Sequence, residues 1–163
     1  FDQMKMPRTN HQGGVAVGVL RNVDVWEAEL IISLRLCCSG LSGRADVYEE
    51  FSSRFSSERA AKEFETFECL LNSISIYAHR PLLLHDVECS CIGADEQIFV
   101  HLVATASSGD FREASLIATL LIGAAQAEKI TLLAAQVGQT VKQMSLTRTH
   151  VHARSPRTSA QLH

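Results

Sequence analysis

Apolar residues recur along most of this chain at alternating steps of three and four, the spacing that places them on one face of an α-helix. The clearest case is SERAAKEFETFECLLNSISIYAH, residues 57–79, with Ser57 as the expected N-cap. The apolar residues on its face are Ala60, Phe64, Phe67, Leu71, Ile74 and Ala78. Pro81 stops the pattern, because the residue before a proline disfavours helical dihedral angles. The spacing therefore predicts one helix of about six turns.

Other segments have a similar pattern, and a short helix is expected at 45–55. The remaining predicted helices are 24–38 (DVWEAELIISLRLCC), 94–106 (ADEQIFVHLVATA), 111–125 (FREASLIATLLIGAA) and 127–146 (AEKITLLAAQVGQTVKQMSL). Gly40 and Gly43 are expected to end the first of these four helices and to form the turn after it. Asp110, with Glu113 three positions later, predicts a helix start at Phe111. Together these segments predict an all-α fold, a single-domain helical bundle of about five to six helices with a flexible cationic C-terminal arm.

The two ends of the chain fall outside the helical pattern. GGVAVGVLRNV, residues 13–23, alternates weakly, but its glycines disfavour a strand, and a lone strand has no partner in this fold. We expect residues 1–22 to be an irregular segment and residues 23–146 to be the helical bundle domain. Residues 147–163 contain too few apolar side chains to join a core, so we expect a basic, mobile tail there.

Composition restricts the class of protein. With 163 residues, the chain is long enough to bury roughly two thirds of the surface that it exposes when unfolded. The apolar fraction of 46% and the charged fraction of 20% are those of a globular protein rather than a disordered one. The sequence has no uncharged apolar run of about 18 residues, so we expect no membrane span. Five cysteines, an odd number, are not typical of a secreted disulfide framework, so we expect a cytoplasmic protein.

Charge is distributed unevenly along the chain. Up to Glu128 there are 18 acidic and 10 basic residues, a net charge of -8, whereas from Lys129 onward there are five basic residues and no acidic one, a net charge of +5. A cationic arm of this kind binds phosphates or an acidic partner, folds back on its own acidic body, or remains a solvated tail. The sequence leaves these alternatives open.

The densest group of potential ligand atoms is HDVECSC, residues 85–91, between two predicted helices. His85, Cys89 and Cys91 supply the nitrogen and sulfur donors that zinc prefers, so a zinc site is one hypothesis. Against it, C-x-C differs from the usual C-x-x-C spacing, and a fourth ligand would have to be His79, Cys69 or Asp86. A second hypothesis is redox sensing, with Cys91 close to a helix start and Cys89 as its resolving partner. The third is that the loop only packs against the bundle.

A further segment, ITLLAAQVGQTVKQMS at 130–145, has Ala134 and Gly138 at the spacing of the small residue and the turn glycine of a DNA-binding helix pair. It resembles the helix-turn-helix of bacterial repressors, and the resemblance implies DNA binding by residues 130–157. Four basic residues suited to phosphate contacts lie within or behind it: Lys142, Arg148, Arg154 and Arg157. The alternative is one continuous helix that tolerates a glycine.

The helix predicted at 111–125 is apolar on most sides between Leu116 and Ile122, which is typical of a core helix or a subunit interface. We therefore expect a homo-oligomer or a protein partner bound through residues 114–125. Nucleotide-binding, zinc-protease and nucleophile-elbow motifs do not occur in the sequence, so nothing in it argues for an enzyme. The expected function is that of a small non-enzymatic binding or regulatory module with a metal- or redox-sensitive loop at 85–91. A DNA-binding regulator is the alternative, and an enzyme with an unrecognised site is the third hypothesis.

Overall fold

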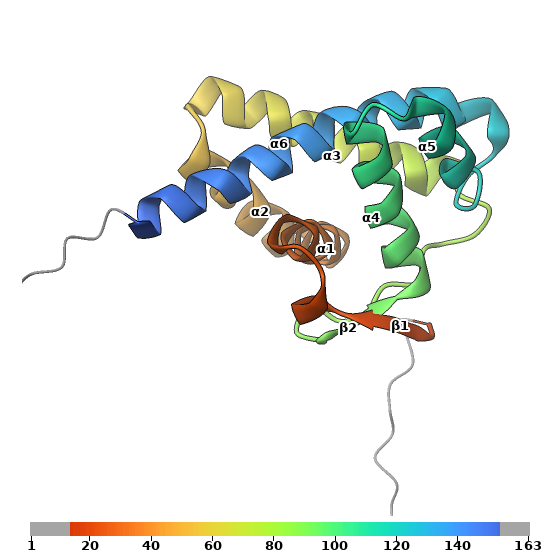
Figure 1. Cartoon of the computed structure of the whole chain (residues 1–163), viewed down its shortest axis with the longest axis horizontal. Helices are drawn as coiled ribbons and strands as arrows, with labels where there is room; N and C mark the ends of the chain where they lie inside the picture. Colours follow the sequence, from red (N-terminus) through yellow and green to blue (C-terminus); the bar gives the residue numbers. More distant parts are fainter. Residues whose placement is uncertain (1–13, 154–163) are drawn as a thin grey trace, which may run out of the picture.

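The computed structural model describes residues 14–153, and the side chains of residues 14–148 (Figure 1). The helices of this part are α1 (Val25–Cys38), α2 (Leu41–Arg54), α3 (Ser57–Tyr77), α4 (Ala94–Ser107), α5 (Phe111–Ala118) and α6 (Ala127–Ala153). Two short strands, β1 (Ala16–Val19) and β2 (Cys91–Gly93), and two 3-10 turns, Leu20–Asn22 and Ala124–Gln126, complete it. The chain thus forms a mostly helical single domain, and the predicted all-α bundle is confirmed.

Two helices, α3 and α5, start directly after a polar residue whose side chain caps them. The Ser56 hydroxyl accepts a hydrogen bond from the Arg59 N–H at 3.4 Å, so the cap of α3 lies one residue before the predicted position. Asp110 caps α5 as predicted, because its carboxylate accepts from the Glu113 N–H at 3.1 Å. These two periodic stretches therefore begin where a side chain can bind the first free amides of the helix.

The longest helix, α6, crosses the molecule and contacts all the other helices (Figure 1). Its buried face carries the apolar residues that the spacing predicted, Leu133 being partly buried: Ile130, Leu133, Ala134, Val137, Val141 and Met144. Gly138 lies where α6 crosses α4, and a β-carbon there would be 2.6 Å from the Ser107 β-carbon and 3.0 Å from the Val103 side chain. The glycine permits a close crossing of two helices.

The predicted helix-turn-helix geometry is wrong, because α6 runs without a break from Ala127 to Ala153. The alternative of one continuous helix is the correct one. Residues 147–153, which were predicted to belong to the tail, are part of α6, and the rest of the predicted tail lies outside the described residues.

Residues 1–22 were predicted to be irregular, but part of this segment forms the strand β1. β1 pairs antiparallel with β2, with Ala16 opposite Gly93 and Val19 opposite Cys91. The Leu20 N–H continues the ladder to the Ser90 carbonyl at 2.9 Å. The partner of this strand is the end of the His/Cys loop, which had been expected to have no strand. This small sheet lies at the end of the molecule opposite α5 (Figure 1).

Two helix boundaries differ from the prediction. Gly40, with φ of 128°, separates α1 from α2, but Gly43 lies inside α2, where a β-carbon would be 2.1 Å from the Leu36 carbonyl oxygen. The helix predicted at 111–125 ends at Ala118, and the chain then pairs with the end of α3 through the bridge between Ala78 and Ile122.

Candidate functional site

The His/Cys loop is held by one arginine of α1. Arg35, only 2% exposed, donates from Nε and Nη2 to the two oxygens of Glu96 at 2.7 and 2.8 Å. Its remaining N–H groups donate to three backbone carbonyls of the loop, those of Asp86 (3.2 Å), Cys89 (2.7 Å) and Cys91 (2.6 Å). A guanidinium has five N–H donors, and all of them are used here. The backbone of the loop is therefore fixed to the core.

Glu96 binds the same loop from the other side. Its carboxylate also accepts from the His85 N–H at 3.0 Å and the Gly93 N–H at 2.8 Å. Burial raises the pKa of Glu96, but the hydrogen bonds from Arg35 and Gly93 outweigh burial, so the pKa is lower than usual. We call Arg35, Glu96 and the loop groups that they bind the arginine clamp. It is a buried ion pair in which every donor and acceptor has a partner.

A second pair holds the segment that leads from α3 into the loop. Arg80 donates to both oxygens of Asp95 at 2.7 and 3.0 Å, and the Leu83 N–H donates to the same carboxylate at 2.8 Å. Burial raises the pKa of Asp95, but these hydrogen bonds overcome it and leave the pKa below its ordinary value. Sequence reasoning missed both carboxylates, because an acidic pair at a helix start is normally solvated. The signal that could have identified them is the adjacent Asp–Glu pair inside the largely apolar stretch CIGADEQIFV, residues 91–100.

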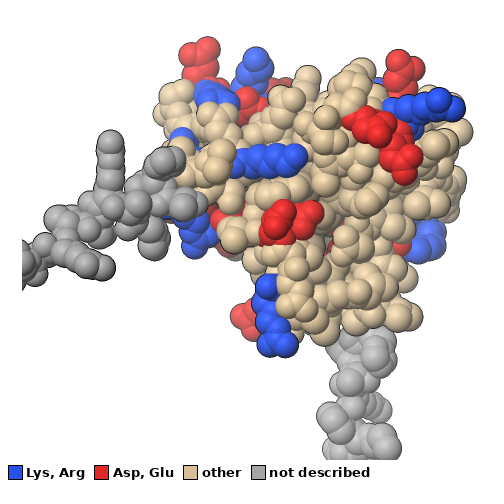
Figure 2. Space-filling view, viewed as in Figure 1, with Lys and Arg blue, Asp and Glu red and all other residues tan. Residues whose placement is uncertain are grey.

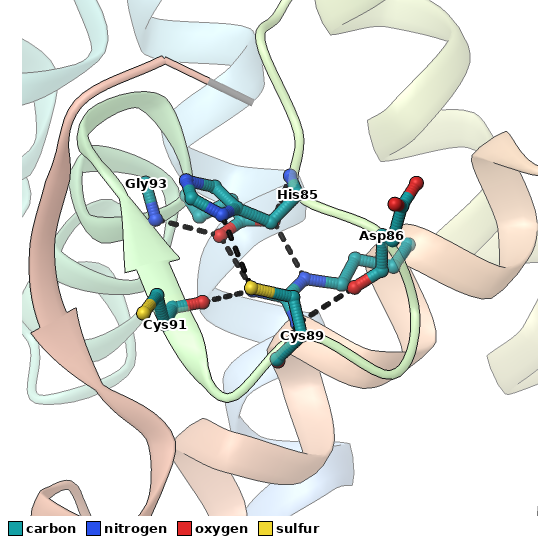
Figure 3. A network of polar contacts seen from close by, with 7 residues as sticks. His85, Asp86, Cys89, Cys91 and Gly93 are labelled. Carbon is teal, nitrogen blue, oxygen red and sulfur yellow. Dashed lines mark hydrogen bonds and ion pairs between the residues drawn. The ribbon is translucent and has the colours of Figure 1, made fainter. Parts of the chain in front are cut away.

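Figure 3 shows the three predicted site residues of this loop. His85 Nδ1 and Cys89 Sγ lie 3.4 Å apart, and the other ring nitrogen of His85 is buried without a hydrogen-bond partner among the described residues. The Cys91 sulfur points away from that of Cys89 (Figure 3). Within residues 14–148, no three His, Cys, Asp or Glu side chains are grouped so that they could hold a metal ion. The loop therefore joins His85 to Cys89 but does not bring the three predicted zinc donors together.

The adjacent thiols of α1 lie at a different place, close to Arg44 and Glu68. Burial, followed by the neighbouring Cys38, raises the pKa of Cys37 to about 12, whereas the Cys38 side chain is exposed. Since the thiolate is the reactive form of cysteine, Cys37 is poorly suited to redox chemistry at neutral pH.

Two of the four basic residues predicted to contact nucleic acid bind the chain's own body. The Lys142 ammonium lies 4.8 Å from the Trp26 ring centroid and donates to the Ser107 hydroxyl at 2.8 Å. Arg148 donates to Glu29 at 2.9 Å. Figure 2 shows charges of both signs scattered over a largely uncharged face. Arg154 and Arg157 lie outside the described residues. Nucleic-acid binding by the four basic residues therefore stays a prediction, and the helix-turn-helix no longer supports it.

The described part of the chain also contains a groove of about 310 Å³ between α1, α2 and α6, which we call the α1/α2/α6 groove. Its apolar lining comes from all three helices and from α3: Ile32, Leu36, Val47, Phe51, Phe67, Val141 and Met144. Ionised side chains also line it: Glu29, Asp46, Glu50 and Arg148. Sequence reasoning missed this groove, because helical spacing shows which residues are buried and not where a core stays open.

The predicted interface at 114–125 divides into two parts. Ile117 and Ile122 are buried in the domain, whereas Leu116 and Leu120 are 60% and 64% exposed. The core thus explains the apolar residues that are buried, and the partner expected at this segment stays a prediction.

No helix among residues 14–153 is both long and apolar enough to cross a membrane. Fold and site define the class only as a mostly helical single-domain protein with a loop fixed by a buried arginine and an open apolar groove. Comparison of the chain with protein-family models, curated proteins and solved structures finds no match.

Proposed function

We propose that this protein is a non-enzymatic binding module that takes a helical segment of a partner protein into the α1/α2/α6 groove. The observation that carries the proposal is that core side chains line an opening on the surface. Phe51, Val141 and Met144 are nearly buried residues of the main core, yet they line the groove. A partner side chain placed there would pack directly against the core.

The chemistry of the groove, an apolar lining with charged side chains beside it, suits an amphipathic helix. Amphipathic helices bind by laying one apolar face into such a groove, with residues spaced three and four apart as anchors. Ile32 on the α1 side is 37% exposed, so its side chain offers apolar surface that a partner would cover. Covering that surface favours binding by about 25 cal/mol for each Å² removed from water.

Selection of random helical peptides of about 16 residues on the full chain tests this function. We expect the selected peptides to lose about tenfold or more in affinity for Ile32→Glu, because a carboxylate would have to be buried under the bound helix. The matched control is Ile76→Glu, at an α3 position that is 73% exposed and does not line the groove. Circular dichroism checks that both variants fold. Peptides that bind the Ile32 and Ile76 variants equally well would place the binding surface elsewhere.

A second role, regulation through the loop thiol, is supported by the contact of Cys89 with His85. The Cys89 carbonyl is bound by Arg35 at 2.7 Å, so a group added to the sulfur would press on the imidazole and on the arginine clamp together. We propose that modification of Cys89 loosens the loop.

A further inference from the structure

The acidic side chains of the α1/α2/α6 groove indicate what kind of segment it takes. Glu29, Asp46 and Glu50 line the groove, whereas Arg148 is the one cation among its lining residues as described. Asp46 is exposed and has no ion-pair partner among the described residues. One carboxylate is therefore free to bind a cation from outside.

The other two carboxylates already bind guanidinium groups of this chain. Glu29 accepts from Arg148 at 2.9 Å, and Glu50 accepts from Arg54 at 2.5 Å. Arg54 at the same time donates to the Met144 carbonyl at 2.7 Å, at the edge of the apolar lining. The groove thus already contains guanidinium groups bound to carboxylates beside an apolar floor. A cationic ligand would add further contacts of the same kind.

We propose that the groove binds a cationic amphipathic helix of a partner protein, with its apolar face on the floor and its lysines or arginines next to Asp46 and Glu50. This inference rests on the proposed function and adds the charge of the partner. Complementary charge speeds association and rejects partners of the wrong sign. An acidic helix would bring like charges together at a partly apolar surface, where their repulsion is less screened than in water.

Three synthetic peptides of about 16 residues test the proposal by fluorescence anisotropy with the full chain. One is a Leu/Lys helix with its leucines on one face, the second has glutamate in place of every lysine, and the third is a scrambled Leu/Lys sequence. We expect the amphipathic Leu/Lys helix to bind at least about tenfold more tightly than either of the others. Its affinity should fall as salt is raised, because ions screen the carboxylates.

Charge variants of the groove separate a specific contact from a general attraction to an acidic protein. Asp46→Lys should weaken binding of the Leu/Lys helix by about five- to tenfold at low salt, since it reverses the one unpaired carboxylate. The matched control is Glu49→Lys, on the same helix and with the same change in net charge, but outside the groove lining. We expect the control to lose less than about twofold.

The possible outcomes distinguish failure of the cationic partner from failure of the proposed helix-binding function. If the glutamate peptide binds as tightly as the lysine peptide and Ile32→Glu abolishes both, the cationic partner is wrong and the binding groove stands. If Ile32→Glu changes neither peptide, both proposals fail.

Two other occupants of the groove would also be revealed. If Arg154→Glu with Arg157→Glu raises the affinity of the full chain for the Leu/Lys helix, the chain's own residues 154–163 compete for the groove and the external partner is overturned. Self-association that Ile32→Glu abolishes would assign the groove to a second copy. Unchanged affinity and a monomeric chain support the proposal.

Discussion

Two faces of α1 use opposite means of packing. Toward the loop, Arg35 is buried as a charge and makes five hydrogen bonds in the arginine clamp. Toward α2 and α6, Ile32 and Leu36 line an apolar opening. The charged side chain is buried with all its donors hydrogen-bonded, whereas the apolar side chains line a groove that is open to solvent. The polar network thus fixes the loop to the core, whereas apolar side chains such as Ile32 leave part of their surface uncovered, the reverse of what residue type alone would predict.

The largest expected effect comes from breaking the arginine clamp. Arg35→Met should lower the free energy of unfolding by about 3–5 kcal/mol, because it leaves the buried Glu96 carboxylate and three loop carbonyls without their partner. Urea denaturation measures the loss. Arg112→Met, at an exposed position of α5, is the control and should change stability by less than about 0.5 kcal/mol. A loss below 1 kcal/mol in the Arg35 variant would mean that the clamp does not fix the loop.

Acid should weaken the ion pair of Glu96 with Arg35 and that of Asp95 with Arg80. Asp95 and Glu96 have a lower pKa in the folded chain than their ordinary values of 3.8 and 4.5. Both carboxylates therefore stabilise the folded state at pH values above these, and this stabilisation is lost as the pH falls through their folded-state pKa. Urea denaturation at pH 7, 5, 4 and 3 should show stability falling mainly below about pH 4.5.

A matched pair of variants assigns this acid loss. Glu96→Gln should remove part of the fall, because its side chain cannot ionise, whereas Glu65→Gln, at an exposed position of α3, should keep the wild-type profile. Identical profiles for the two variants would contradict the assignment to Glu96.

Sequence patterns predicted the positions of the amphipathic helices better than the polar contacts between distant segments. Sequence patterns located the six helices within residues 14–153, because burial repeats with the turns of a helix within one segment. The pairing of Arg35 with Glu96 spans 61 positions, and β1 finds its partner in a three-residue strand, so neither is visible locally. Gly138 has the spacing of a turn glycine, but a glycine is needed there because α4 crosses α6 closely, which only the packed structure shows.

The candidate site was predictable to the same extent. His85 and Cys89 are four positions apart and meet, as a compact loop allows. Cys91 belongs to β2, whereas Cys89 closes the turn before it, where its N–H donates to the Asp86 carbonyl at 2.9 Å. The backbone changes from turn to strand between the two cysteines, and because this strand was not predicted, the C-x-C spacing could not show that the sulfurs separate.

Modification of the loop thiol should have an intermediate effect. Alkylation with N-ethylmaleimide should lower the free energy of unfolding by about 1–2 kcal/mol, because the bulky group at Cys89 displaces His85 and strains a loop whose backbone is fixed. Thermal unfolding before and after labelling measures the shift, and mass spectrometry locates the label.

Two serine variants show which thiol is responsible. Cys89→Ser should escape this loss, whereas Cys69→Ser, which removes an exposed thiol of α3, should lose as much as the wild type. If Cys89→Ser is destabilised by labelling as strongly as the wild type, regulation through this loop is ruled out.

The smallest effect is expected on the open face of α1. Ile32→Ala removes side-chain carbons that are already 37% exposed, so it should cost under about 1 kcal/mol of folding free energy, well below the 2–5 kcal/mol of a fully buried site. Leu30→Ala, at a fully buried position of the same helix, is the control and should cost the larger amount. Urea denaturation of both variants makes the comparison directly. Because the groove binds through this side chain in our proposal, Ile32→Ala should weaken peptide binding more than it weakens folding. Equal losses in the two alanine variants would show that Ile32 belongs to the closed core, and the groove would then have no free wall for a partner.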